Sequence, residues 1–237
     1  MHKTGEWLLL LLLGIFLNAC TLVPKTPEPL TPNNSAAGDA LPDGEGWWYA
    51  RFFIDRPDDE SPQWHIDTLL AGEVIAPVFD HHYRDILIWR FHRRAADDDY
   101  GHVFSFIFYA TAAGAQRVYN ELGAHPVLAQ LRRDGQVTRV LFDDLGEIKR
   151  PAIEDTSDQD WLPVVQQAWP AMIMGASRMW LEIVTSLAAE QSSDLVLEDR
   201  YRAVNEEVGR IWREQGQHAV LHHLSAIYGY EPLLIRY

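Results

Sequence analysis

Arginines and histidines gather in one stretch of the chain, LIWRFHRRAADDDYGHVFSFIFYA (87–110), between runs of aromatic and aliphatic residues. Guanidinium groups bind carboxylates and phosphates through paired hydrogen bonds and stack on aromatic rings. Imidazole titrates near neutral pH and can act as a general acid or base. Arg90, His92 and His102 are therefore the first candidates for a site that holds an anionic ligand.

Alternation along the two apolar runs predicts which side chains share a face of a sheet. The aspartates between the runs are interpreted as the solvated turn of a hairpin, with weak local ion pairs. In the simplest register, Arg90 and His92 lie on one face with His102, Phe104 and Phe106. The opposite face, which is expected to lie under helices, then carries Leu87, Trp89, Phe91, Val103, Ser105, Ile107 and Tyr109.

Two further arginines extend the candidate site onto neighbouring strands. Arg51 lies in the first predicted strand and Arg139 in the last. If the registers agree, Arg51, Arg90, His92 and Arg139 form a cationic stripe. One interpretation is a cleft for a small anionic ligand. The other is internal pairing, in which acids of the C-terminal helices, such as Glu182, Glu206 and Glu207, neutralise the arginines.

The hydrophobic periodicity predicts an α+β fold between about residues 47 and 150. Strands and helices alternate in the ferredoxin-like order βαββαβ, in which an antiparallel sheet carries both helices on one face. The predicted strands are 46–55, 86–93, 102–110 and 137–144. The first predicted helix begins at Ser61-Pro62 and runs to about 78, with a stop or kink at Pro77, and the second covers 113–134.

Beyond Pro151, wide apolar stripes predict a C-terminal set of about three helices, packed on the sheet so that 47–150 and 151–237 form one domain. The expected helices are 157–187, kinked or split at Pro170, then 195–214 and 217–228.

The chain begins with a short basic start, an apolar run and then its single cysteine, Cys20. The run is too short for a transmembrane helix but suits a signal peptide over 1–19. Leu17-Asn18-Ala19-Cys20 resembles the lipobox of bacterial lipoproteins, which implies cleavage before Cys20 and lipid on its thiol. Thr21 implies, by the same resemblance, the outer membrane. Residues 20–46, rich in proline, are predicted to be the lipid anchor and a tether.

The segments between about 47 and 144 follow an order that resembles a known family. WWYARF, DTLLAGEVIAPVF, ILIWRFHR, GHVFSFIF and LRRDGQVTRVLFDD are similar in layout to the C-terminal domain of lantibiotic dehydratases and the related thiopeptide-type biosynthesis domain. The similarity lies in order and in a few hydrophobic positions. Those proteins act on peptides in the cytoplasm, whereas this chain carries an export signal, so none of their active residues is transferred to it.

Common catalytic motifs are missing from the sequence: GxGxxG, the P-loop, GxSxG and HExxH do not occur. His81-His82 follows a predicted helix end, and His218 and His222 share the solvated side of a helix. We interpret both pairs as surface histidines and expect neither a metal nor a cofactor.

Charge and export together limit the function. With 34 acidic and 20 basic residues, the formal charge of -14 makes a nucleic-acid partner unexpected. We expect a non-catalytic envelope lipoprotein, held in the membrane through lipid on Cys20, that binds an envelope protein or a small anionic ligand. The alternative is an envelope hydrolase or transferase that uses His92 or His102. A third hypothesis, a scaffold in a larger assembly, requires a large exposed apolar patch.

Overall fold

The computed structural model describes residues 41–56 and 61–232. The predicted signal peptide, the predicted lipidation site Cys20 and the tether up to residue 40 lie outside this part of the chain. Leu41 packs against the core, and the first strand begins at Glu45. Within the described ranges, none of the helices combines the length and the apolar character that crossing a membrane requires.

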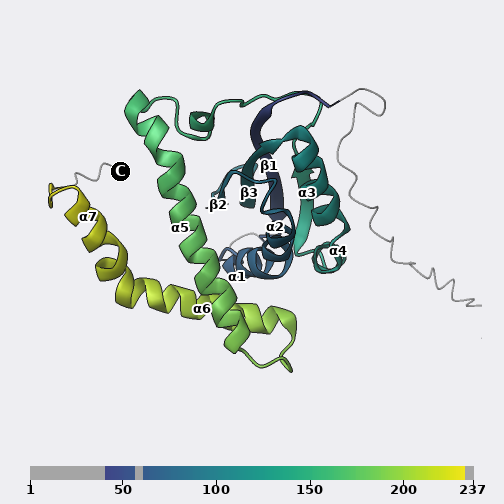
Figure 1. Cartoon of the computed structure of the whole chain (residues 1–237). Coiled ribbons are helices and arrows are strands. Elements are labelled where there is room, and N and C mark those ends of the chain that lie inside the picture. The colour runs from purple at the N-terminus through teal and green to yellow at the C-terminus, as the bar shows by residue number, and fades with distance from the viewer. Residues whose placement is uncertain (1–40, 57–60, 233–237) are drawn as a thin grey trace, which may run out of the picture.

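Four antiparallel strands form the sheet (Figure 1): β1 (Glu45–Ile54), β2 (Ile88–Ala95), β3 (His102–Thr111) and β4 (Val137–Phe142). The strand order is β2-β3-β1-β4, so β2 and β4 are the edges. The expected mixture of helices with an antiparallel sheet is confirmed.

Both connections are helical, and their buried hydrophobic residues belong to the same core cluster as one face of the sheet. The connection from β1 to β2 contains α1 (Trp64–Leu69), η1 (Leu70–Ile75, a π-helix) and α2 (Ala76–His82), and that from β3 to β4 contains α3 (Ala112–Ala124) and α4 (Pro126–Arg133). Phe52, Phe104, Phe106 and Phe108 point to this side, because alternate strand residues share a face. They are fully buried and form the centre of the hydrophobic core.

Pro77 does not end the first helical run, which continues to His82. Proline lacks the N–H that an α-helix uses and normally interrupts its bonding. Here the π-helical segment Leu70–Ile75 ends just before α2, and Pro77 is the second residue of α2, in its first turn. A missing donor is tolerated in a first turn, so the chain stays helical.

The hairpin register differs by one residue from the simplest pairing, and this changes the face assignments. Arg90 pairs with Ile107 and His92 with Ser105. The expectation that Arg90 and His92 share a face with His102, Phe104 and Phe106 is therefore wrong. Because side chains alternate with a period of two, a slip of one residue moves one whole strand to the opposite face.

The second face of the sheet is partly covered by the chain that follows Arg150. The Trp47 indole Nε1 donates to the carbonyl oxygens of Ala152 (3.1 Å) and Ile153 (2.9 Å), and the Tyr109 hydroxyl donates to Pro151 O (2.6 Å). This segment includes the short 3-10 helix η2 (Ile153–Thr156).

The long helix α5 (Pro163–Glu190) lies along the edge strand β2. It is one helix with Pro170 inside it rather than two. The Ser177 hydroxyl accepts a hydrogen bond from the Phe91 backbone N–H (3.0 Å), and the Trp180 ring packs 5.4 Å from Phe91. The helix thus satisfies part of an edge that would otherwise be free to pair with another strand.

The remaining C-terminal helices are α6 (Leu197–Gly216), η3 (Gln217–His222, a π-helix) and α7 (His223–Ile227). The start of α6 packs mainly on α1, and the Tyr201 hydroxyl donates to Glu73 Oε1 (2.9 Å) on the neighbouring η1. Gly72 allows this approach, because a Cβ there would lie 2.4 Å from that hydroxyl. The later part, 208–227, which we call the arm, extends away from the sheet and faces α5 across a V (Figure 1).

Candidate functional site

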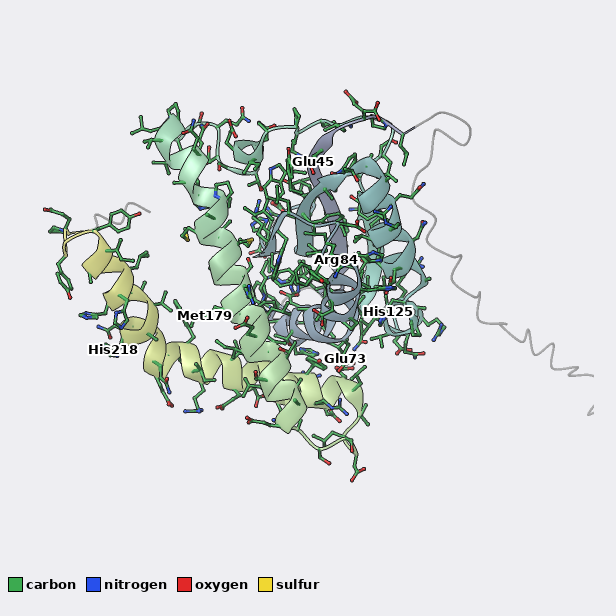
Figure 2. The ribbon with its side chains drawn as sticks, viewed as in Figure 1. Glu45, Glu73, Arg84, His125, Met179 and His218 are labelled. Atoms are coloured by element: carbon green, nitrogen blue, oxygen red, sulfur yellow. The ribbon has the colours of Figure 1, made fainter. Side chains whose placement is uncertain are left out.

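A groove of about 1050 Å³ lies between α5 and the arm. Met179 is on the side of α5 that faces the arm (Figure 2). Most of the side chains that line the two walls are apolar: Ala176, Met179, Trp180 and Ile183 on α5, and Val208, Ile211, Trp212, Ala219 and Val220 on the arm. The α6 wall also carries four polar residues: Asn205, Glu206, Arg213 and Gln215. An open apolar surface of this kind typically marks a binding or interaction site.

Trp64 and Arg93 line the groove on the side of the sheet. The Arg93 guanidinium lies 5.0 Å from the Trp64 ring centroid and 4.9 Å from that of Trp180. Its Nη2 donates to Trp64 O (3.1 Å). Stacking between two indoles holds the planar cation in one orientation.

Arg93 joins the groove to a buried carboxylate. Its Nε donates to Asp67 Oδ2 (2.7 Å), and the Asp67 side chain is fully buried. The second oxygen, Oδ1, is 2.9 Å from Nε2 of the equally buried His102. This contact has the distance of an ion pair but not the geometry of a hydrogen bond, so Asp67 Oδ1 and both His102 nitrogens have no hydrogen-bond partner within the described residues. We call Asp67, Arg93 and His102 the buried cluster.

On the other face of the sheet, Arg51 has internal partners. Its Nη1 donates to Asp143 Oδ1 (2.8 Å), and Arg150 binds the other oxygen of the same carboxylate. Both guanidinium groups lie over the Tyr49 ring, at 4.5 Å for Arg51 and 4.0 Å for Arg150. Two cations therefore share one carboxylate and one aromatic ring.

Arg90 and Arg139 are also engaged on this face. Arg90 Nε donates to the Thr156 hydroxyl (2.8 Å), and its guanidinium lies 5.1 Å from the Trp169 ring centroid. Arg139, which is exposed, lies 3.7 Å over the Phe53 ring. The face thus holds its arginines mainly through aromatic rings and short polar contacts.

His92 is exposed on the same face. Partial desolvation lowers the pKa of its imidazole, and the positive charges of Arg90 and Arg94 lower that pKa further. A neutral imidazole beside two cations can accept a hydrogen bond at neutral pH. The charged groups that act on His92 are arginines, however, and not the carboxylate that usually orients a catalytic histidine.

The structure therefore brings four of the five candidates to one face: Arg51, Arg90, His92 and Arg139. His102 lies on the opposite, helix-covered face, where it belongs to the buried cluster. The acids that neutralise arginines are not the expected ones. Glu182 pairs with Arg178 and Glu207 with Arg210, both within their own helices, whereas Asp143 serves the sheet.

Sequence reasoning did not connect Asp67 with Arg93. Asp67 lies between Ile66 and Thr68 within a buried helical segment, and Arg93 is two residues after Phe91, on the core-facing parity of β2. A charged residue at a buried position signals a partner, because an unpaired buried charge is costly. Both elements carried this signal, but nothing in the sequence indicated that Asp67 and Arg93 contact each other.

One group among the described residues has the spacing of metal ligands: His81 and His82 at the end of α2, with Glu121 on α3. It lies apart from the residues that line the groove. The pairing of His81 with His82 was visible in the sequence, but Glu121 was not connected to them.

Comparison with known proteins gives no match: no family model matches the chain, and neither a curated protein nor a solved structure matches it. The resemblances to bacterial lipoproteins and to lantibiotic dehydratases therefore stay predictions.

Proposed function

We propose that this protein is a lipid-anchored, non-catalytic assembly module of the bacterial cell envelope, which associates with a second copy of itself through the groove. The groove is the single observation that carries the proposal, because an assembly protein requires an exposed apolar surface for its partner. The lipid on Cys20 and the location at the periplasmic face of the outer membrane rest on the sequence alone.

The size of the groove suits a short helix. A helix about 10 Å across occupies roughly 120 Å³ per residue, with a rise of about 1.5 Å. A volume of about 1050 Å³ then holds about nine residues. The end of the arm, η3 and α7, spans Gln217–Ile227 and is of similar length.

The chemistry of the arm favours a second copy as the occupant. Leu221, Leu224 and Ile227 follow one another at helical spacing and are 52%, 40% and 79% exposed. The main contacts of α7 are with η3, and those of η3 are with α6 and α7. In a two-fold symmetric dimer, the arm of each chain would enter the groove of the other chain. The same contact is then made twice, and it buries the apolar surfaces of both chains.

The four helices of such a pair, two α5 and two arms, would form a bundle with an apolar interior. The formal charge of -14 opposes association of like chains. Salt screens that repulsion, and we therefore expect the pair to strengthen as ionic strength rises toward the physiological range.

The fold that presents this groove is proposed to be ferredoxin-like. Support comes from the strand order β2-β3-β1-β4 and from a helical connection after β1 and after β3. Residues of both connections lie in the same core cluster as the inner residues of the sheet.

The geometry gives less support to an envelope hydrolase or transferase. A general acid or base must open onto a cavity and have a partner within reach. His102 has the Asp67 carboxylate beside it but is not among the residues that line the groove, and the charges acting on His92 are arginines. Binding of a small anionic ligand is the second candidate function. The ligand would bind the sheet face that carries Arg51, Arg90, His92 and Arg139, because Arg139 is exposed there.

Sedimentation equilibrium of residues 21–237 tests the proposal. We expect a monomer–dimer equilibrium that shifts to dimer with added salt, and a monomer for Ile227→Glu and Met179→Glu. Leu87→Glu is the matched control, because Leu87 is 63% exposed but lies before β2, away from the groove. A wild-type chain that stays monomeric at high micromolar concentration would rule out self-association, and native mass spectrometry would then show whether the chain retains a small ligand instead.

A further inference from the structure

Two adjacent histidines at the end of α2 converge on one carboxylate oxygen of α3. His81 Nδ1 lies 2.9 Å from Glu121 Oε2, and His82 Nε2 lies 2.8 Å from the same oxygen. Neighbouring residues of a helix point about 100° apart, since a turn takes 3.6 residues. Convergence of both rings on one point therefore depends on α3 and not on the helix alone.

The three side chains offer one ligand atom each, and these atoms all lie within 4.8 Å of one another. Two imidazole nitrogens and a carboxylate oxygen are a donor set that Zn²⁺ accepts, with bonds of about 2.0–2.2 Å. Such bonds in a tetrahedron place the ligand atoms roughly 3.3 Å apart. Each nitrogen has to move about half an ångström away from the oxygen, and the two nitrogens, which lie within 4.8 Å of each other, have to settle at the same tetrahedral spacing. His81, whose side chain is 72% exposed, has room to move.

The surroundings of His82 fit a ligand as well. Its second nitrogen, Nδ1, is 3.5 Å from Asp85 Oδ2. Arg117 fixes that carboxylate through Nε (3.0 Å) and Nη2 (2.8 Å). A carboxylate behind a metal-binding histidine orients the ring and sets which nitrogen faces the metal. Arg117 and Glu121 lie one turn apart on α3. The same helix therefore supplies the ligand Glu121 and, through Arg117 and Asp85, the contact that orients the ligand His82.

We infer that His81, His82 and Glu121 bind one divalent transition-metal ion, with Zn²⁺ as the expected occupant. The His82 side chain is 11% exposed and anchors the site, whereas His81 leaves the solvent side open. Three protein ligands leave a fourth tetrahedral position for water. The site links the end of α2 to α3, so metal binding stabilises the folded chain. The inference is independent of the groove and of self-association.

Calorimetric titration of the full-length protein with Zn²⁺, in detergent and without a polyhistidine tag, tests this inference. We expect one saturable site per chain and a rise in the thermal midpoint of unfolding. His82→Ala and Glu121→Gln should each remove both effects. Asp85→Asn should weaken binding by about tenfold to a hundredfold, because it removes only the support of the ring.

The second histidine cluster provides a matched control. His218, His222 and His223 lie on the arm (Figure 2 labels His218), with ring centroids 5.2–5.4 Å apart. Replacing all three by alanine should leave the proposed site intact. Zn²⁺ binding that survives His82→Ala but disappears in this triple variant would overturn the inference, as would the absence of 1:1 binding in the wild type.

Folding of the variants is checked separately. His81→Ala removes an exposed side chain and should keep the thermal midpoint measured without metal, yet lose the Zn²⁺-induced rise. Cobalt supplies a second readout, because tetrahedral Co²⁺ absorbs visible light much more strongly than hydrated Co²⁺. A wild-type protein whose Co²⁺ spectrum equals that of His81→Ala would contradict the assignment of His81 as a ligand.

Discussion

At the scale of single residues, the buried cluster is the most demanding feature of the molecule. The Asp67 carboxylate is fully enclosed, with the Arg93 guanidinium against one oxygen and the buried His102 ring against the other. Charges inside a protein are stable only when they are paired, and removing one partner leaves the other uncompensated. Because Arg93 also lines the groove, the cluster fixes the orientation of a side chain on the proposed binding surface.

Asp67→Asn should therefore destabilise the fold by about 3 kcal/mol, since it leaves Arg93 without its buried counter-charge. Urea unfolding of residues 21–237, followed by tryptophan fluorescence, measures the change. Asp97→Asn is the control: Asp97 pairs with Arg56 at 3.0 Å, but its side chain is 90% exposed. Its loss should cost under about 1 kcal/mol. Equal effects of the two variants would show that the cluster is not an energetic unit.

At the scale of elements, α5 decides how the edge of the sheet is closed. Its Trp169 end lies over Arg90 on one face, and Trp180 packs against Phe104 on the other. The helix, which lies along the edge strand β2, therefore contacts residues of both faces of the sheet. Ser177 lies between these two contacts and accepts the Phe91 N–H.

Ser177→Ala should cost about 1–3 kcal/mol, because the buried Phe91 amide loses its acceptor. Amide hydrogen exchange at Phe91 should become faster in the same variant. Thr185→Ala is the matched control. Both hydroxyls donate to the carbonyl oxygen four residues earlier on α5, Ser177 to Ile173 (2.8 Å) and Thr185 to Leu181 (3.0 Å). Within the part of the chain that the structure describes, only Ser177 also accepts a hydrogen bond from a strand. If both variants lost the same stability, the bond to β2 would have no measurable role.

At the scale of the whole molecule, an acidic body with an open apolar groove follows a proline-rich segment. A tether of about 25 residues, extended at about 3.1 Å per residue, would let the body stand several tens of ångströms from a bilayer. If Cys20 carries the proposed lipid, anchoring would also confine two copies to one membrane surface. A higher local concentration favours the weak self-association that like-charged chains allow.

Cys20→Ala should release the protein from the membrane as a soluble, folded body, because the acyl chains are the proposed anchor. Fractionation of the producing cells, with the wild type as reference, measures the distribution, and circular dichroism checks the fold. A Cys20→Ala variant that stays with the membrane would contradict lipid anchoring. Loss of the anchor should also lower the dimer fraction in cells without changing the dimer constant in solution.

The sequence by itself determined where most strands and helices lie, because periods of two and of 3.6 residues are local properties. The predicted strands 46–55, 86–93, 102–110 and 137–144 match β1 to β4 within a few residues. Alternation also placed Arg51, Arg90, His92 and Arg139 on one face.

Only the tertiary structure decided the rest. The hairpin register depends on how residues 96–101 close the turn, and a difference of one residue moved His102 into the core. Asp67 and Arg93, like Glu121 and the pair His81-His82, come from elements far apart in the chain. The groove arises because the arm leaves the sheet while α5 stays on it. Such contacts depend on how elements pack in three dimensions, and no local period encodes them.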